Sequence, residues 1–286
     1  MKSQNQEIFR RILLYSALTI CVIFAVWMAS FVPNADWYGT FDPGAREIFQ
    51  GRSPYGQPLF VNPPWTVLLL LPYVLFPANI ARGMILVSSL IAMIYAGWRL
   101  RAPKAAVIAL MLSPTAIGSL LAGILDALVL LGIFLTPTWG LLVLMMKPQI
   151  GIGAAIYYLF EAWRNNRAVG IVRTFGPVVL AYVISGVLFP VWVDRFIHKP
   201  SNEWNRSIFP YSIPLGLFFL WLGVRKQNRF FAMAAAPFLS PYLTFYTYAI
   251  VQIGLLHEDV EKVIRRDVLQ IILCIFLWTI MLVFKL

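Results

Sequence analysis

The sequence predicts an all-α fold, a polytopic bundle of membrane helices that forms a single integral membrane domain over residues 1–286. Three observations indicate this class. Hydrophobic residues make up 60% of the 286-residue chain. Their runs are continuous rather than alternating, which favours spanning helices over an outer-membrane barrel. Charged residues make up only 12%, against about 25% in soluble domains, so a soluble globule and a disordered chain are both excluded.

Apolar runs follow one another along most of the chain. They lie at about 11–32, 64–77, 79–98, 105–122, 124–146, 149–163, 170–192, 208–224, 230–256 and 268–285. Several are shorter than the roughly 20 residues of a spanning helix, so we expect about eight to ten membrane segments, some short or broken. Proline punctuates these runs at Pro114, Pro137, Pro148, Pro237 and Pro241. The prolines indicate either helices broken around an outward-facing cavity or ordinary kinks in membrane helices.

The net charge of +11 comes from Lys and Arg that gather in short loops. This distribution is typical of cytoplasmic loops and not of nucleic-acid binding, so no nucleic-acid partner is expected. It predicts a multi-pass protein of the cytoplasmic (inner) membrane with its N-terminus in the cytoplasm, and with 33–62 and 193–207 facing outward. Two full crossings between residues 63 and 98 would put Arg99 outside. Either one of the runs 64–77 and 79–98 is re-entrant, or the rule fails locally.

The outward segment 33–62 directly follows the first apolar run. Pro43 favours the first turn of a helix and Gly51 favours its end, so we expect a short surface helix within 43–50. Asp36 stands at the end of the first run, whereas Asp42 precedes Pro43 and is well placed to cap the surface helix. From their position alone, both carboxylates can also be simple solvated loop residues without a function.

Neighbouring side chains add a binding character to this segment. Flat aromatic surfaces suited to a sugar or a lipid come from Trp37, Tyr38, Phe41 and Tyr55. Arg46 and Arg52 carry the planar charge that suits a phosphate. Together these residues predict a site for an anionic lipid with a polar head.

Two charged residues interrupt the apolar runs further along the chain. A charge at membrane depth is costly and indicates function by default, so Lys147 is a candidate for binding, with snorkelling to the interface as the alternative. Asp126 either pairs with Lys147, which is a structural role, or lines the cavity. In the second outward segment Arg195 and His198 are further candidates, with simple solvation as the alternative.

The segment from Asp36 to Pro72 carries a recognisable pattern. It reads D-W-x-x-T-F-x-P-G-A-R-x-x-x-x-G-x-S-P-Y, then N-P-P-W and L-L-P, and resembles the start of glycosyltransferase family 87. Weaker similarities follow in G-I-L-D-A-L at 123–128, in M-K-P-Q at 146–149, and in S-P-Y at 240–242 with Tyr246. The chain differs from the family in being shorter and in having Ile124 where Gln is usual.

The resemblance implies a GT-C-like membrane enzyme, similar to the polyprenol-phosphate-mannose-dependent mannosyltransferases. Such an enzyme moves a sugar, a hexose such as mannose, from a polyprenyl-phosphate donor to an acceptor hydroxyl on a lipid or glycan at the outer membrane face, with inversion. The implied base is Asp36, with Asp42 as second candidate. The implied phosphate partners are Arg46, Arg52, Lys147, Arg195 and His198. Trp37, Tyr38, Tyr55 and Asp126 would contact substrate.

Two other readings of the chain stay open. The short length and Ile124 favour a non-catalytic GT-C-like protein, a lipid-binding or assembly subunit of a membrane complex. Broken helices also suit a secondary transporter, although no inverted repeat is visible. No metal site and no cofactor is expected, because the sequence holds no H-E-x-x-H, D-x-D or cysteine cluster. The expected partners are the polyprenyl-phosphate sugar, its acceptor and membrane lipids.

Overall fold

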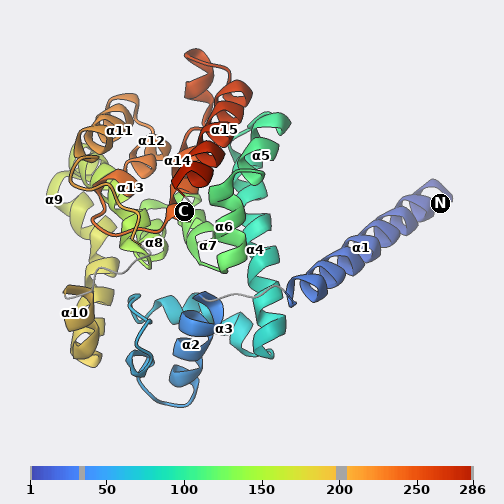
Figure 1. The fold of residues 1–286 in the computed structure, drawn as a ribbon, viewed down its shortest axis with the longest axis horizontal. Helices are drawn as coiled ribbons and strands as arrows, with labels where there is room; N and C mark the ends of the chain where they lie inside the picture. Colours follow the sequence, from blue (N-terminus) through green and yellow to red (C-terminus); the bar gives the residue numbers. More distant parts are fainter. Residues whose placement is uncertain (1, 32–35, 198–204, 285–286) are drawn as a thin grey trace.

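A computed structural model describes residues 2–31, 36–197 and 205–284 of the chain. Over these residues the secondary structure is helical throughout, joined by turns and loops, with no strand (Figure 1). The all-α class predicted from the apolar runs is therefore confirmed.

The helices are mostly short. The α-helices are α1 (Lys2–Ala29), α2 (Asp42–Phe49), α3 (Thr66–Val74), α4 (Ala78–Arg99), α5 (Lys104–Met111), α6 (Pro114–Ala122), α7 (Asp126–Leu130), α8 (Pro137–Leu144), α9 (Pro148–Leu188), α10 (Pro190–Ile197), α11 (Ile213–Lys226), α12 (Arg229–Ala234), α13 (Ala236–Leu239), α14 (Ala249–Gly254) and α15 (Arg266–Phe284). A π-helix, η1 (Trp37–Phe41), precedes α2. The 3-10 segments are η2 (Pro54–Gly56), η3 (Leu131–Phe134), η4 (Phe245–Tyr248) and η5 (Glu258–Lys262).

Three helices of the described chain are long and apolar enough to cross a membrane: α4, α9 and α15, the last over Arg266–Val283. The pair α5 and α6, bent by 58° at their junction, makes a fourth if it counts as one span. Non-helical backbone angles at Asn166 and Arg167 break α9. Fewer helices therefore meet the length of a full span than the eight to ten segments expected, because most apolar runs fold into several short helices.

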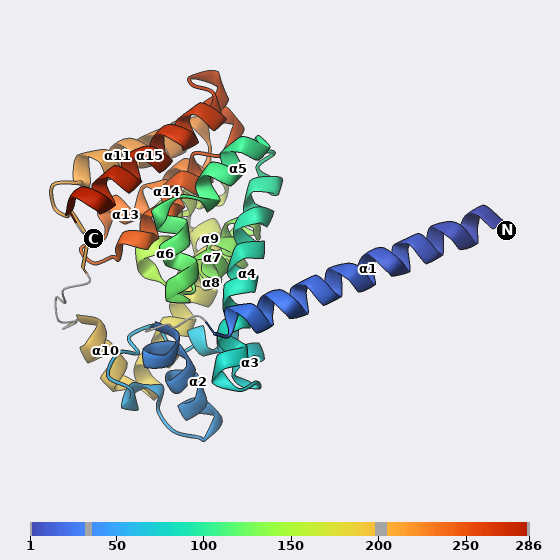
Figure 2. The ribbon, with the colours of Figure 1, turned by 45° about the vertical axis from the view of Figure 1, so that its right-hand side comes forward.

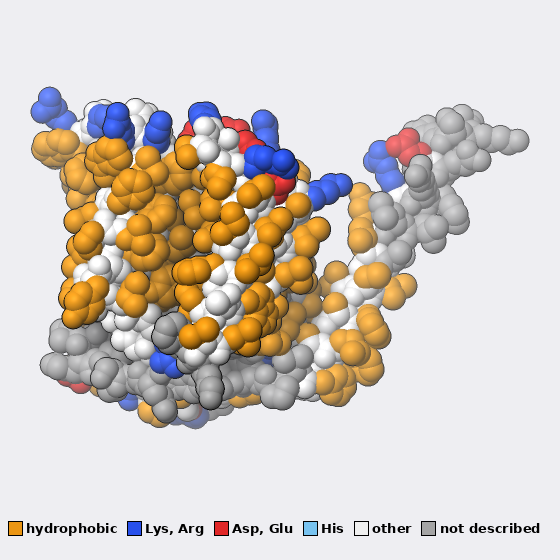
Figure 3. Space-filling model, turned by 45° about the horizontal axis from the view of Figure 1, so that its top comes forward, with side chains coloured by type: hydrophobic (Ala, Val, Ile, Leu, Met, Phe, Trp, Pro, Cys, Tyr) orange, Lys and Arg blue, Asp and Glu red, His pale blue; other side chains and the backbone are white. Residues whose placement is uncertain are grey.

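The segment 63–98 contains a single helix of spanning length. α3 has nine residues and α4 has 22, so the run 64–77 does not cross on its own. This favours the re-entrant alternative. Arg99, at the end of α4, lies with Arg229 and His257 around one cavity, so two arginines that are distant in the sequence meet at one end of the molecule. Figure 3 shows Lys and Arg gathered along one edge of a broad hydrophobic surface. We call the end of the molecule that holds Arg99 and Arg229 the basic edge.

Four of the five prolines singled out in the sequence stand in the first turn of a helix. Pro114, Pro137 and Pro148 stand in the first turn of α6, α8 and α9, where the missing amide hydrogen costs nothing. Pro237 has the same place in α13. The interpretation as broken helices therefore holds at Pro114, Pro137 and Pro148. Pro237 lies inside the apolar stretch Arg229–Leu239 that α12 and α13 form together, where the interpretation as a kink stays open.

Helix α1 stands away from the body of the molecule and meets it at α4 (Figures 1 and 2). The contact is close because Gly83 faces Val26: a Cβ added at Gly83 would lie 2.1 Å from the Val26 carbonyl oxygen. On the N-terminal side of this contact, apolar side chains of α1 are exposed, among them Ile20, Ile23 and Phe24. Such a surface fits lipid or another membrane helix.

The expected surface helix is present as α2. It begins at Asp42, has Pro43 in its first turn, and is followed by Gly51 with a φ of 70°. Gly44 packs against the Phe60 ring so closely that an added Cβ would lie 2.5 Å from it. These contacts hold η1, α2 and the loop to Phe60 together as one layer beneath the bundle (Figure 1).

Candidate functional site

Asp36 lies at the start of η1 and is half-buried. The Tyr246 hydroxyl donates a hydrogen bond of 3.2 Å to its Oδ2 atom across 210 positions of sequence. Tyr246 comes from η4, and its ring packs on Gly118 of α6, where an added Cβ would lie 3.2 Å away. Burial, and then the Asp36 carboxylate, raise the pKa of Tyr246. The phenol therefore stays protonated at neutral pH and keeps donating to Asp36.

Asp126 and Lys147 form a buried ion pair beside this contact. The Lys147 ammonium donates to Asp126 Oδ1, and Thr247, next to Tyr246, donates to Oδ2 at 2.8 Å. The exposed fraction is 9% for the Lys147 side chain and 4% for that of Asp126. Of the two alternatives for Asp126, pairing with Lys147 and lining the cavity, the structure shows the pairing. A charge that is matched in this way is less costly to bury than a lone one.

Asp42 does not cap the surface helix, which corrects the expectation drawn from Pro43. The π-helix η1 runs directly into α2, so the Asp42 amide already bonds to the Trp37 carbonyl and Phe41 takes the N-cap position. The Asp42 carboxylate instead accepts from Arg46 Nε, at 2.9 Å to each oxygen. Arg46 Nη2 also donates to the Phe76 carbonyl at 2.8 Å, which ties α2 to the end of α3.

Arg52 is likewise paired. Its guanidinium donates to both carboxylate oxygens of Glu47, and this hydrogen bond lowers the pKa of Glu47. The Arg52 side chain nevertheless remains 59% exposed. Arg195 of α10 donates to the Gln57 carbonyl at 2.7 Å and so joins the second outward segment to the first. His198 lies outside the described residues.

The aromatic residues named as binding surfaces are mostly internal. Trp37 is fully buried and its indole N–H donates to the Ala78 carbonyl at 2.9 Å. Tyr55 is 3% exposed and its hydroxyl donates to the Asn62 carbonyl at 2.7 Å; burial raises its pKa. Phe41 is also buried, so of the four aromatic residues only Tyr38 offers an exposed face, at 39%.

Arg82 is the charged residue at this end that the sequence analysis missed. It is fully buried in α4, and its Nη2 donates to the carbonyls of Leu120 and Leu121 at 3.2 and 2.8 Å. These carbonyls close α6, where a cation is favourable. Its Nε and Nη1 atoms have no hydrogen-bond partner in the described part of the chain. The sequence feature that could have identified Arg82 is a charged residue inside the apolar run 79–98, the same kind of feature that identified Lys147.

Comparison with protein-family models, with curated proteins and with solved structures finds no match for this chain.

At the end of the molecule that holds η1 and α2, here called the outer end after its predicted orientation, the candidate base is Asp36. The carboxylates of Asp42 and Asp126 each form an ion pair, with Arg46 and Lys147 respectively, and Asp36 accepts a hydrogen bond from the Tyr246 hydroxyl. A half-buried carboxylate that a hydrogen bond positions can take a proton from a hydroxyl substrate. Among the described residues no group of three or more His, Cys, Asp or Glu is placed to hold a metal ion.

Proposed function

We propose that the chain is a membrane glycosyltransferase of GT-C type. It moves a sugar, a hexose such as mannose, from a polyprenyl-phosphate donor to the hydroxyl of a lipid or glycan acceptor at the outer face of the cytoplasmic membrane. One observation supports this most strongly: the segments that carry the family resemblance meet around Asp36. Tyr246 donates to Asp36, and its neighbour Thr247 donates to Asp126, which pairs with Lys147.

In this reaction Asp36 is the base that takes the proton of the acceptor hydroxyl. Tyr246 positions its carboxylate. The acceptor oxygen attacks the anomeric carbon as the bond to the lipid phosphate breaks, and one displacement without a second carboxylate nucleophile gives inversion. The phosphate needs cations as it leaves. Arg46 and Arg52 remain 36% and 59% exposed, so each can turn from its carboxylate to a phosphate.

The orientation follows from the basic edge. With the basic edge and the N-terminus in the cytoplasm, η1 and α2 lie at the outer face, where a lipid-linked sugar and its acceptor meet. The protein is then a multi-pass protein of the inner membrane, as the distribution of Lys and Arg predicts.

A second candidate function is a non-catalytic lipid-binding or assembly subunit of a membrane complex. Two observations favour it. The cations Arg46, Arg52 and Lys147 all have carboxylate partners, and α1 presents exposed apolar side chains away from the body.

Substitution of Asp36 separates the two candidates. We expect Asp36→Asn to lower sugar transfer by about 10²- to 10⁴-fold, the usual contribution of a general base, while binding of the polyprenyl-phosphate donor is kept. Transfer is measured in membranes that contain the full chain, normalised to folded protein. Asp42→Asn is the matched control: it removes an equal charge six positions away and should keep most of the activity.

Tyr246→Phe removes the hydrogen bond but not the carboxylate, so a partial loss is expected. Wild-type turnover in Asp36→Asn would contradict the assignment of the base. A wild type that binds donor lipid and transfers no sugar to any tested acceptor would favour the non-catalytic candidate.

A further inference from the structure

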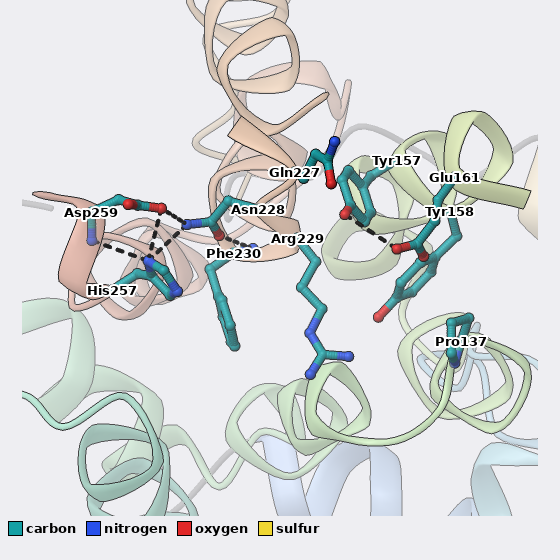
Figure 4. A pocket seen from close by; sticks show the side chains of 10 residues that line it. All are labelled: Pro137, Tyr157, Tyr158, Glu161, Gln227, Asn228, Arg229, Phe230, His257 and Asp259. Carbon is teal, nitrogen blue, oxygen red and sulfur yellow. Dashed lines mark hydrogen bonds and ion pairs between the residues drawn. The ribbon is translucent and has the colours of Figure 1, made fainter. Parts of the chain in front are cut away.

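Two adjoining cavities lie at the basic edge, at the opposite end of α4 from η1. Their volumes are about 400 and 370 Å³, and Arg229, Phe230 and His257 line both. The second one, here called the basic-edge cavity, is also lined by Arg99 and Arg101 from the end of α4. Figure 4 shows the first cavity, in which the Arg229 side chain extends between Phe230 and Tyr158.

The three arginines of the basic-edge cavity have no carboxylate partner in the described part of the chain. Other groups fix two of them. Arg99 donates to the Tyr95 hydroxyl at 2.9 Å and lies over the Phe134 ring at 5.5 Å. Arg229 donates to the Leu135 carbonyl at 3.3 Å. Each keeps further N–H groups for another acceptor, because a guanidinium has five.

Arg101 is held at the cavity by the backbone. It has a φ of 49°, a left-handed conformation that is uncommon for a residue other than glycine. The turn is closed by the amide of Ala102, which donates to the Gly97 carbonyl at 3.0 Å. The conformation ends α4 and keeps Arg101 beside Arg99 at the rim of the cavity.

His257 adds a neutral donor to the same wall. Its Nδ1 accepts from the Asn228 amide at 2.7 Å and from the Asp259 backbone N–H at 3.2 Å, and this network assigns the ring proton to Nε2. Asn228 is itself fixed, because its Oδ1 accepts from the Phe230 amide at 2.9 Å. Burial lowers the pKa of His257, so the ring is uncharged at neutral pH. Its Nε2 forms no hydrogen bond with a described residue.

The charge around the basic-edge cavity is unbalanced. Three arginines face a single carboxylate, that of the exposed Glu258. Like charges that converge on one space repel one another and favour a bound anion. Guanidinium groups match the geometry of phosphate oxygens and bind them with paired hydrogen bonds. Trp98, next to Arg99 and 69% exposed, is typical of the membrane interface, the level of lipid headgroups.

We propose that the basic-edge cavity binds a phosphate monoester, carried on a lipid headgroup or free in solution. Arg99, Arg101 and Arg229 supply the charge that holds it, and His257 Nε2 supplies a further donor. This site is separate from the outer site around Asp36 and does not depend on the proposed sugar transfer.

The test measures binding to the purified full chain in mild detergent. The probes are dioleoyl phosphatidic acid against dioleoyl phosphatidylcholine, counted as bound lipid by native mass spectrometry, and inorganic phosphate against chloride at matched ionic strength, followed by the melting temperature. We expect the chain to bind phosphatidic acid at least about tenfold more tightly than phosphatidylcholine. Arg99→Gln with Arg101→Gln should remove about tenfold of that affinity.

The matched control is Arg225→Gln with Lys226→Gln, which removes two exposed charges in the last turn of α11, close in sequence to Arg229 but not part of the cavity lining. It should change affinity by less than about twofold. Stabilisation by inorganic phosphate as well would assign recognition to the phosphate group itself, and binding of phosphatidic acid alone would assign it to lipid; both support the proposal. Equal losses in the two double variants would overturn it. So would equal binding of the two lipids together with no effect of phosphate.

Discussion

The two ends of the molecule treat their positive charges differently. At the outer end each of three cations meets a carboxylate: Arg46 with Asp42, Arg52 with Glu47, and Lys147 with Asp126. At the basic-edge cavity three arginines, Arg99, Arg101 and Arg229, share one space without an ion pair among the described residues. A cation that a carboxylate already neutralises attracts a further anion less strongly than an accessible cation without such a partner. The position of a cation in the sequence does not distinguish the two cases.

Breaking the most buried pair should have the largest effect on stability. Lys147→Met leaves the Asp126 carboxylate buried without its cation, so we expect the free energy of unfolding to fall by about 3–5 kcal/mol. Denaturant unfolding of the full chain in mild detergent measures this loss.

The double variant Asp126→Asn with Lys147→Met is the control. It removes both charges, while the asparagine oxygen can still accept from Thr247, so most of the lost stability should return. The single variant Asp126→Asn completes the comparison. If the double variant loses as much free energy of unfolding as the sum of the losses in Lys147→Met and Asp126→Asn, the two side chains are not coupled, and this ion pair does not stabilise the outer end.

A smaller effect on the stability of the folded chain is expected from His257 at the basic edge, and this effect depends on pH. Burial lowers the pKa of His257 below its ordinary value of 6.5, and the nearby carboxylates of Asp259 and Glu258 oppose this only in part. Below pH 6.5 the unfolded chain therefore binds a proton that the folded chain does not, and stability falls as the pH falls through 6.5 toward the lower folded-state pKa.

His257→Gln should remove this decline, because glutamine does not titrate. The melting temperature of both proteins is followed from pH 7.5 to 5.5. Asp259 does not obscure this window, because hydrogen bonds from Lys262 and Asn228 lower its pKa below 3.8. An identical decline in the two proteins would show that His257 is not held neutral in the cavity wall.

The smallest effect is expected for Arg52→Gln at the outer end. Arg52 is exposed and bonds only to the neighbouring Glu47 carboxylate among the described residues, and such surface pairs contribute little. Neither the melting temperature nor the binding of phosphatidic acid should change. A clear loss of phosphatidic acid binding would show that Arg52 holds this lipid without the sugar donor and despite its ion pair, and would break the contrast between the two ends.

Much of the fold could be predicted because it rests on local signals. The continuous apolar runs predicted helices, and Pro43 with Gly51 predicted α2. The pairing of Asp126 with Lys147 was one of two alternatives, since a charge buried among apolar residues needs a partner. Starts of helices at Pro114, Pro137 and Pro148 follow from the same local chemistry.

The remaining features depend on contacts that are distant in sequence. In a membrane protein hydrophobicity marks lipid-facing and internal side chains alike, so the burial of Trp37 and Tyr55 was not predicted. The prediction that Asp42 caps the surface helix was wrong because η1 continues directly into α2. A π-helix has no clear signal in the local sequence. The contact of Tyr246 with Asp36 spans 210 positions. Arg82 had a signal, an arginine in an apolar run, and was overlooked.

The Asp126–Lys147 pair also constrains how the chain enters the bilayer. α7 has five residues and α8 has eight, too few to cross alone, and each separate charge would cost about 2.5–3.5 kcal/mol at the bilayer centre. The two residues are 21 positions apart, so both leave the ribosome within about four seconds at roughly 5–20 residues per second. We expect the translocon to release the stretch from Asp126 to Lys147, which holds α7, η3, α8 and the residue before α9, as one electrically neutral unit. Thr247, 121 positions after Asp126, joins that unit only when the last third of the chain is made.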